Sequence, residues 1–190
     1  MKGKVEDPAE TEKSSSSDVF ESHRTKLDIP QRLVEKYHMK PHPEGGFYAE
    51  TYRAISTVTS SYGTRAAGTA ILFLITPGSV SRLHRLASDE TWHFYLGGPM
   101  TVVELSDAGV LKKTVLGSDV LGGEQRVQYT VKAGTWFGSY PNKGSPFSFV
   151  GCTVAPGFEF DDFELASQAK LLGKYPQHSE EIKLLTKGLP

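Results

Sequence analysis

Short apolar segments between Phe47 and about Val154 constrain the fold of this chain more than any other feature. They read FYAETYRAIS, TAILFLIT, ETWHFYLG, MTVVELS, VLKKTVLG, RVQYTVKAG and FSFVGCTVA, and they are rich in β-branched and aromatic residues. Gly, Pro, Asn, Asp or Ser stands between most of them. Strands of this length and spacing predict an all-β antiparallel sandwich or barrel rather than alternating β–α units.

A helix is predicted immediately before the strands. Asp28 and Gln31 have the spacing of a capping box, and apolar residues recur on one face at steps of four: Ile29, Leu33 and Tyr37. The sequence HPEGG then ends that helix, because proline and paired glycines both interrupt it. Residues 1–26 are polar and low in complexity, so we expect a disordered tail, whose serine run is open to phosphorylation.

The sequence returns to helical patterns after the last strand. Asp161 and Glu164 have capping-box spacing, and a helix with one apolar face is expected to run from there to Gly173. Ser179 is expected to cap a last short helix that ends at Gly188. The chain therefore divides into three parts: a tail over 1–26, an all-β domain over 27–175 with short helices at its ends, and a helical extension over 176–190.

Composition excludes several classes of function. The 190 residues suit one domain with a tail, and 21 Lys+Arg nearly balance 22 Asp+Glu, so no surface for nucleic acid or an anionic membrane is expected. The single cysteine, Cys152, lies in a strand, where a buried and inert thiol is expected. The sequence shows no signal peptide and no apolar run that would span a membrane, so a cytoplasmic location is expected. It also lacks phosphate-loop, dinucleotide-binding and Gly-x-Ser-x-Gly motifs.

The segment GSVSRLHRLASDETWHFYLGG (78–98) places potential acid–base and metal-binding side chains at a defined spacing. Gly78 is followed by five residues and His84, then come Leu86, three residues and Glu90, and finally six residues and Gly97. This spacing resembles the first motif of the cupin superfamily, except that Leu86 stands where the motif has a second histidine. Strand alternation directs the polar residues of that motif to one spot, where two imidazoles and a carboxylate suit Fe, Mn, Ni or Zn.

The segment GEQRVQYTVKAGTWFGSYPN (123–142) resembles the second cupin motif less completely. Lys132-Ala133-Gly134 stands where the motif has Pro-x-Gly. Phe137 stands where it has its last histidine, and Asn142 comes one residue late. The glycine framework of the motif is therefore present without its metal ligand.

The resemblance implies four metal ligands, and this sequence keeps two of them, His84 and Glu90. His93 lies near both, but strand alternation places it on the opposite face from Glu90. A divalent metal at His84 and Glu90 is therefore expected to bind weakly, and no cofactor is expected.

Three longer segments narrow the resemblance: HPEGGFYAETYR (42–53), SDETWHFYLG (88–97) and VGCTVAPGFEFDDFELA (150–166). They resemble signatures of the cupin_5-type branch of small cupins, over residues 28–172. The resemblance implies an RmlC-like double-stranded β-helix, which is a jelly-roll barrel, often found as a homodimer. That branch is largely uncharacterised biochemically, so the resemblance implies a fold and leaves the activity open.

His84 and Glu90 are the candidate catalytic residues, because the motif directs both side chains into the barrel. The pair can transfer protons, with Glu90 orienting the imidazole or raising its pKa. Alternatively, the two side chains form a buried pair that only satisfies its own hydrogen bonds.

Other residues are candidates for binding a small molecule at the barrel mouth. His42 and Glu44 precede a Gly-Gly turn that either lets backbone approach a ligand or caps the barrel. Arg53 can hold an anionic group or form a surface ion pair with Glu50, although strict alternation places it on the face opposite Tyr48 and Glu50. Four aromatic residues are candidates for the pocket wall, with ordinary core as the alternative: Trp92, Phe94, Trp136 and Phe137.

Three functions are compatible with these residues. The first is a metal-independent epimerase or isomerase of a small polar substrate, similar to cupins of the sugar-nucleotide epimerase type that use a His–acid pair. The second is a protein that binds a small ligand without changing it, similar to storage and hormone-binding cupins. The third is a metal-dependent oxygenase or isomerase, which needs ligands that the motif positions do not supply.

Overall fold

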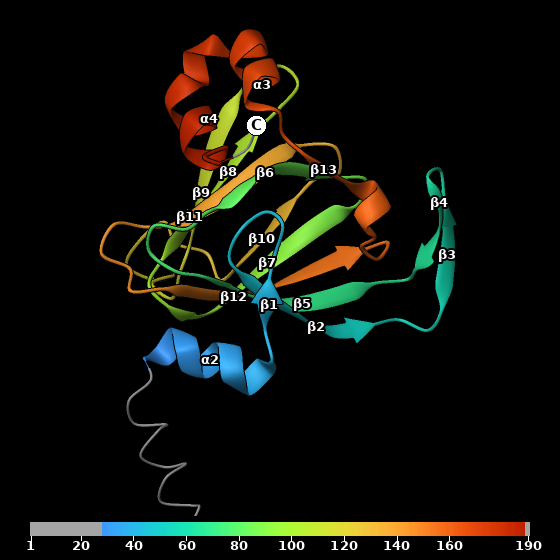
Figure 1. Cartoon of the computed structure of the whole chain (residues 1–190), viewed down its shortest axis with the longest axis horizontal. Coiled ribbons are helices and arrows are strands. Elements are labelled where there is room, and N and C mark those ends of the chain that lie inside the picture. Colours follow the sequence, from blue (N-terminus) through green and yellow to red (C-terminus); the bar gives the residue numbers. More distant parts are fainter. Residues whose placement is uncertain (1–27, 189–190) are drawn as a thin grey trace, which may run out of the picture.

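The computed structural model describes residues 28–188, and the predicted disordered tail over 1–26 lies outside them. Two antiparallel sheets face each other around a shared core (Figure 1). One sheet has the strand order β1-β2-β5-β12-β7-β10, formed by Lys40–Pro41, Phe47–Arg53, Thr69–Ile75, Ser148–Ala155, Asp89–Gly97 and Gln128–Val131. The other has the order β13-β6-β11-β8-β9, formed by Phe163–Leu165, Ser81–Leu86, Trp136–Pro141, Met100–Leu105 and Leu111–Leu116. The predicted jelly-roll barrel is confirmed.

The core between the sheets follows from the alternation of side chains along each strand. Phe73, Trp92 and Val150 project inward from the six-stranded sheet. Met100 and Val102 project inward from the five-stranded sheet and pack against them. Burying these residues away from water is the main source of stability for such a barrel.

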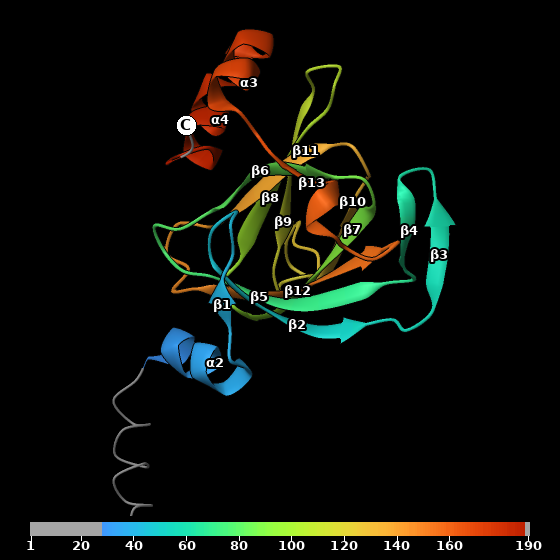
Figure 2. The same ribbon diagram turned by 45° about the vertical axis from the view of Figure 1, so that its right-hand side comes forward.

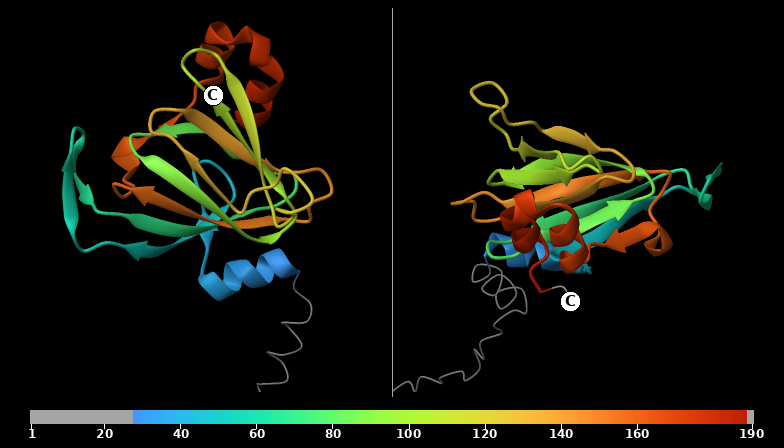
Figure 3. Two further views of the ribbon diagram at one scale, coloured as in Figure 1. Left: turned by 180° about the vertical axis from the view of Figure 1, so that it is seen from behind. Right: turned by 90° about the horizontal axis from the view of Figure 1, so that it is seen from above.

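Short helices cover the outer faces of both sheets (Figure 3). Helix α2 (Ile29–Tyr37) begins at Asp28, whose Oδ1 accepts a hydrogen bond from the Gln31 backbone N–H at 2.9 Å, as the capping spacing predicts. It packs Leu33 and Val34 onto the six-stranded sheet. Helices α3 (Gln168–Lys174) and α4 (Ser179–Leu185), joined by η2 (Pro176–His178), cover the five-stranded sheet. None of the described helices is long and apolar enough to cross a membrane.

The segment after β12 differs from the prediction of a helix beginning at Asp161. The chain instead forms a short 3-10 turn, η1 (Phe160–Asp162), and then strand β13, which pairs with β6. Phe163 packs against the core there while Glu164 pairs with Arg85 outside, an alternation typical of a strand. The capping-box spacing is therefore coincidental, and α3 begins only at Gln168.

Five further strands, β1, β3, β4, β6 and β11, lie outside the apolar segments that were predicted as strands, and of these the cupin motif implies β6. β6 and β11 complete the second sheet, and β3 (Thr57–Ser60) pairs with β4 (Gly63–Ala66) in a hairpin that projects from the barrel (Figure 2). The hairpin sequence TVTSSYGTRA is mostly polar and lacks a regular apolar alternation, so periodicity does not reveal it.

Candidate functional site

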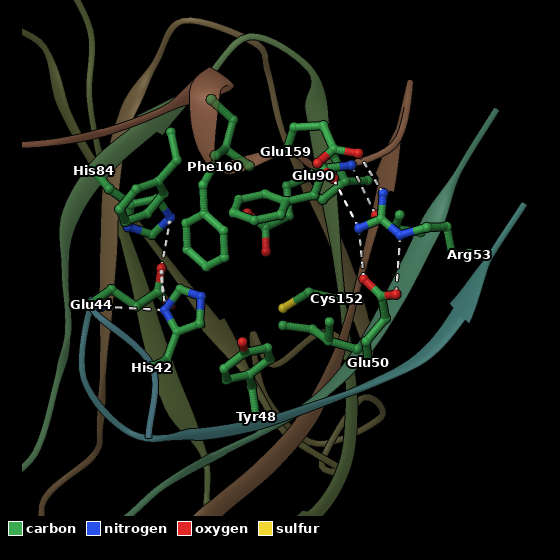
Figure 4. Close-up of a pocket in the computed structure, with 16 residues that line it drawn as sticks. His42, Glu44, Tyr48, Glu50, Arg53, His84, Glu90, Cys152, Glu159 and Phe160 are labelled. Carbon is green, nitrogen blue, oxygen red and sulfur yellow. Dashed lines mark hydrogen bonds and ion pairs between the residues drawn. The ribbon is translucent and has the colours of Figure 1, made fainter. Parts of the chain in front are cut away.

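A cavity of about 290 Å³ opens between the two sheets (Figure 4). Its lining comes from both sheets, from the loop before β2 and from the segment that joins β12 to β13. The lining residues are His42, Glu44, Tyr48, Glu50, Arg53, Thr69, Ile71, His84, Leu86, Glu90, Cys152, Val154, Phe158, Glu159, Phe160 and Phe163. Five of the residues predicted from the sequence as catalytic or ligand-binding are thus brought together: His42, Glu44, Arg53, His84 and Glu90.

The Gly-Gly turn inserts Glu44 into the barrel. Gly45 and Gly46 adopt φ angles of 109° and 68°, a region that favours glycine. A Cβ on Gly45 would lie 2.2 Å from the carbonyl oxygen of Val80, so the loop presses closely onto the second sheet. The carbonyl of Glu44 accepts a hydrogen bond from the Arg82 backbone N–H at 2.8 Å. The glycines therefore serve to close the barrel end with the Glu44 side chain directed inward.

His84 and Glu44 share a proton. The Nδ1 atom of His84 lies 2.7 Å from the carbonyl oxygen of Arg82, which can only accept, so Nδ1 carries a hydrogen. The Nε2 atom faces Oε2 of Glu44 at 3.2 Å, while Oε1 accepts from the Ser81 hydroxyl at 2.9 Å. A contact between Nε2 and Oε2 then requires a proton on one of the two atoms.

Burial favours the neutral forms of this pair. Both side chains are almost completely buried, and burial lowers the pKa of His84. Burial also raises the pKa of Glu44, partly offset by the charge of His42 and by the Ser81 hydroxyl. Both directions favour placing the proton of this contact on the carboxyl group of Glu44, which then donates to Nε2 of His84.

His42 extends this arrangement toward the cavity. Its Nδ1 atom accepts a hydrogen bond from the Glu44 backbone N–H at 3.3 Å, so the neutral ring carries its hydrogen on Nε2. The same Nδ1 lies 3.6 Å from Oε2 of Glu44, and burial lowers the pKa of His42. The Glu44 carboxyl group thus lies between two imidazoles, in a relay formed by His42, Glu44 and His84 (Figure 4).

Glu90 is the second carboxyl group of the cavity. It projects inward from β7, and burial raises its pKa to about 7, with the charge of His84 acting in the opposite direction. It lies beside Cys152, whose thiol pKa is raised by burial. Glu90 and His84 line one cavity, as the motif predicts, but the carboxyl group in contact with the imidazole is that of Glu44. That contact joins residues forty positions apart, for which strand periodicity gives no signal.

Arg53 lies on the cavity side of β2, contrary to the prediction from strict alternation. The pairing of β2 with β5 shifts between Glu50 and Tyr52, and this β-bulge at Thr51 returns Arg53 to the face of Glu50. Its guanidinium forms ion pairs with Glu50 at 2.8 Å and with Glu159 at 2.6 Å. The ion pair with Glu50 was one of the two predicted interactions.

The four aromatic residues proposed for the pocket wall do not line the cavity. Trp92 and Phe137 are buried in the core between the sheets, where the Phe137 ring packs 4.1 Å from the ring of His84, and Phe94 packs against the same core. Trp136 faces the C-terminal helices and the guanidinium of Arg85. The aromatic lining comes instead from Tyr48, Phe158, Phe160 and Phe163. The repeated phenylalanines of GFEFDDFEL were the signal in the sequence for this wall.

The remaining predicted positions agree with the structure. His93 lies outside the barrel, where its Nε2 contacts the Thr153 hydroxyl at 2.9 Å, as alternation predicts. Cys152 is buried, as expected for an inert thiol.

The donor set does not fit a cupin metal centre. Leu86 and Phe137 occupy the positions of two motif histidines and are buried apolar side chains. Over residues 28–188, no three His, Cys, Asp or Glu side chains converge in a way that could hold a metal ion. Both nitrogens of His84 are engaged by Arg82 and Glu44. The cavity residues therefore do not fit the four-ligand metal centre of the cupin motif.

Comparisons with known proteins agree with this architecture. Protein SO0799 from Shewanella oneidensis is 40% identical, over 84% of this chain and 98% of that chain, with a TM-score of 0.77. A hypothetical protein from Leishmania major is 37% identical, over 83% of this chain and 98% of that chain, also with a TM-score of 0.77. The uncharacterized protein YML079W from Saccharomyces cerevisiae is 28% identical over 147 residues, which span 70% of this chain and 72% of the yeast protein.

A more distant likeness concerns the fold alone. A variant of Bacillus subtilis oxalate decarboxylase is 13% identical, over 83% of this chain and 38% of the enzyme, with a TM-score of 0.52. The family model described as "Cupin superfamily (DUF985)", Cupin_5, matches residues 31–166, which include every residue that lines the cavity. The chain therefore belongs to the Cupin_5 family of the cupin superfamily.

Proposed function

We propose that this cupin is a metal-independent acid–base enzyme of the epimerase or isomerase type. One observation carries the proposal: Glu90 and the relay of His42, Glu44 and His84 line the same enclosed cavity. Figure 4 shows the relay on one side of the cavity and Glu90 with Cys152 at its centre. A substrate held between them would meet two separate proton-exchanging groups.

Glu90 is the group that exchanges a proton with the substrate in this mechanism. A carboxyl group with a pKa near 7 has both its acid and its base form available at neutral pH, which suits general acid–base catalysis. As a carboxylate, Glu90 removes a proton from the carbon next to a carbonyl group, and the electron pair moves onto the carbonyl oxygen. The neutral Glu90 carboxyl group then holds that proton.

The relay returns a proton from the other side. The Nε2–H of His42 donates its proton to the same carbon from the opposite face, while the electron pair returns from the oxygen and re-forms the carbonyl group. Nδ1 of His42 takes the proton of Glu44 across the 3.6 Å contact. Glu44 is left as a carboxylate that keeps the hydrogen bond from the Ser81 hydroxyl and loses the one to Nε2 of His84 until a proton returns. The substrate has lost one proton and gained one. His84 acts as a positioning residue, because its hydrogen bond to the Arg82 carbonyl fixes which nitrogen faces Glu44.

Deuterium exchange tests this proposal. Aldoses and ketoses of three to six carbons are incubated with the protein in D2O, and ¹H NMR follows loss of the C–H signal next to the carbonyl group. We expect exchange with at least one sugar, and a decrease of about 10²- to 10⁴-fold in Glu90→Gln. The control Glu164→Gln removes a carboxylate that pairs with Arg85 outside the cavity and is expected to retain the rate. No exchange above the uncatalysed rate for any sugar contradicts the proposal.

A binding protein without catalysis is the second candidate. The segment from Phe158 to Phe160 lines the mouth and is held by Arg53, which donates to Glu159 and to the carbonyl of Phe158. A mouth lined by a segment held in this way suits retention of a small molecule. A sugar that occupies the cavity by NMR yet exchanges no deuterium and remains chemically unchanged favours this role.

We also propose that the chain forms a homodimer through the β3–β4 hairpin. The hairpin projects from the barrel, and large apolar side chains at or beside it are exposed: Tyr52, Ile55 and Val58. In the proposed dimer, a second copy of the chain covers these side chains.

A further inference from the structure

The positive and negative charges around the cavity mouth do not cancel. Glu50 and Glu159 flank Arg53, so two carboxylates lie against one guanidinium. Among the described residues that line the cavity, Arg53 is the one lysine or arginine. The mouth therefore carries net negative charge.

The guanidinium of Arg53 is already engaged. Its Nε and Nη2 donate to the two oxygens of Glu50 at 3.1 and 2.8 Å, and its Nη1 donates to Glu159 at 2.6 Å. Nη2 also donates to the carbonyl of Phe158 at 3.2 Å. These contacts use nearly all of its N–H groups. An anion approaching Arg53 would lie close to both carboxylates, which repel it.

Other cationic groups near the mouth do not reverse this sign. Burial lowers the pKa values of His42 and His84, so both rings are neutral at neutral pH. The guanidinium of Arg65 is balanced by Asp162, whose two oxygens accept from it at 2.6 and 2.8 Å.

Most of the remaining wall is apolar. Ile71, Leu86 and Val154 line the cavity from the strands, and the phenyl rings of Phe158 and Phe160 meet edge to face at 5.0 Å. A ligand must therefore present a flat or apolar face to these rings and place its polar edge at the relay and Glu90.

We propose that the cavity selects small uncharged or cationic molecules with a flat or apolar face and excludes anions such as carboxylates and phosphate esters. This inference rests on the proposed function, because it names the substrate class of the same site. Among epimerase substrates, it favours a free sugar or another neutral hydroxycarbonyl compound over a nucleotide-linked sugar, whose diphosphate would meet Glu50 and Glu159.

A titration with three probes of similar shape tests the charge preference. Benzylamine, benzyl alcohol and benzoate are cationic, uncharged and anionic at neutral pH. Each is added to the full-length protein, and ¹H–¹⁵N NMR follows the backbone amides of cavity residues such as Thr69, Cys152 and Phe158. We expect the first two to shift these signals and benzoate to bind at least about ten-fold more weakly.

A double variant reverses the charge of the mouth. Glu50→Gln with Glu159→Gln leaves Arg53 as an unbalanced cation, so benzoate is expected to gain about ten-fold in affinity and benzylamine to weaken. Glu164→Gln removes a similarly exposed carboxylate outside the cavity. This variant is expected to bind the three probes in the same order of affinity as the wild type.

Benzoate binding as tightly as benzyl alcohol, or an unchanged benzoate affinity in the double variant, overturns the inference. Failure of all three probes to bind overturns it as well, because the aromatic wall would then admit none of them. The titration measures no proton transfer, so these outcomes leave the proposed catalysis to the deuterium experiment. Absence of deuterium exchange, in turn, leaves the order of probe affinities intact.

Discussion

Glu90 shows how the position of one residue sets its chemistry. The side chain is buried on β7 beside the thiol of Cys152, and burial raises its pKa to about 7. An exposed glutamate would be fully ionised at neutral pH and would be a weak base. The barrel therefore makes an ordinary carboxyl group into one that can take or give a proton near pH 7.

Replacing Glu90 with glutamine is expected to change how stability depends on pH. Below about pH 4.5 the carboxyl group is protonated in both the folded and the unfolded chain. Between about 4.5 and 7 only the unfolded chain loses the proton, so the free energy of unfolding of the wild type falls as pH rises, and it levels off above 7. Glu90→Gln has no such titration. Its free energy of unfolding is expected to rise by up to about 3 kcal/mol relative to that of the wild type across that window.

Urea denaturation at about pH 4 and pH 8 measures that difference. His42 and His84 have lowered pKa values and contribute the opposite slope in both proteins. The charge of Glu90 raises the pKa of His84, so Glu90→Gln lowers that pKa further, which adds to the expected difference in the same direction. Glu164→Gln serves as the exposed control, for which no such gain is expected. Parallel pH profiles for the wild type and Glu90→Gln contradict the account.

The rate of deuterium exchange should also follow the ionisation of Glu90. The base form removes the proton, so kcat/KM is expected to rise with pH to a midpoint near 7 and then to level off. Incubations that are stopped at set times across pH 5 to 9 and analysed by NMR locate the midpoint of this profile to within about half a pH unit. A rate that is flat through this range, or that falls as pH rises, would assign the proton removal to another group.

At the scale of the element, the loop from His42 to Gly46 positions one side of the site. Positive φ angles at Gly45 and Gly46 bring its backbone against β5 and β6, which directs Glu44 toward His84. The strands supply the other residues by simple alternation, except at the bulge in β2 that brings Arg53 to the mouth.

Gly45→Ala is expected to destabilise the protein more than Gly78→Ala. Both glycines have positive φ angles, 109° and 83°, but a Cβ at Gly45 would lie 2.2 Å from the Val80 carbonyl oxygen, whereas a Cβ at Gly78 meets nothing within 4 Å. Backbone strain alone costs about 1–2 kcal/mol for alanine in this region, and the clash adds to it at Gly45. Urea denaturation of the two variants compares their free energies of unfolding. Equal losses of this free energy would show that the loop shifts to relieve the clash while Glu44 stays in place.

The cupin motif allowed β6, β7 and the inward directions of His84 and Glu90 to be predicted, because alternation along one strand is a local property. The contact between His84 and Glu44 could not be predicted, since it depends on how a loop folds onto a distant strand. The strand face on which Arg53 lies was predicted wrongly, because the alternation of side chains in FYAETYR does not reveal a β-bulge. Trp136 was misplaced because both faces of its sheet are buried, one of them by the C-terminal helices.

At the scale of the whole molecule, the barrel is covered on two outer faces and leaves its projecting hairpin open. Helix α2 covers one sheet, and α3 with α4 covers the other, so the exposed apolar side chains around β3 and β4 remain without a covering element in the described chain (Figure 1). Ile55, beside this hairpin, is fully exposed.

The homodimer proposal predicts a mass of twice 20.8 kDa by size-exclusion chromatography with light scattering. Ile55→Glu is expected to shift the equilibrium toward the monomer, because it places a charge in the apolar contact. Val120 lies on another loop and is also exposed, so Val120→Glu is a matched control that should leave the mass unchanged. A wild-type monomer at micromolar concentration contradicts this proposal.

The central claim is that Glu90 is poised to exchange protons at neutral pH, and ¹³C NMR titration of its carboxyl carbon tests that claim most directly. Protein labelled at glutamate carboxyl carbons is titrated, and the signal lost in Glu90→Gln assigns the resonance. The account predicts a midpoint near 7, well above the 4.5 of an ordinary glutamate. A midpoint at or below that ordinary value would show that Glu90 is a permanent carboxylate, and the proposed acid–base role would be wrong.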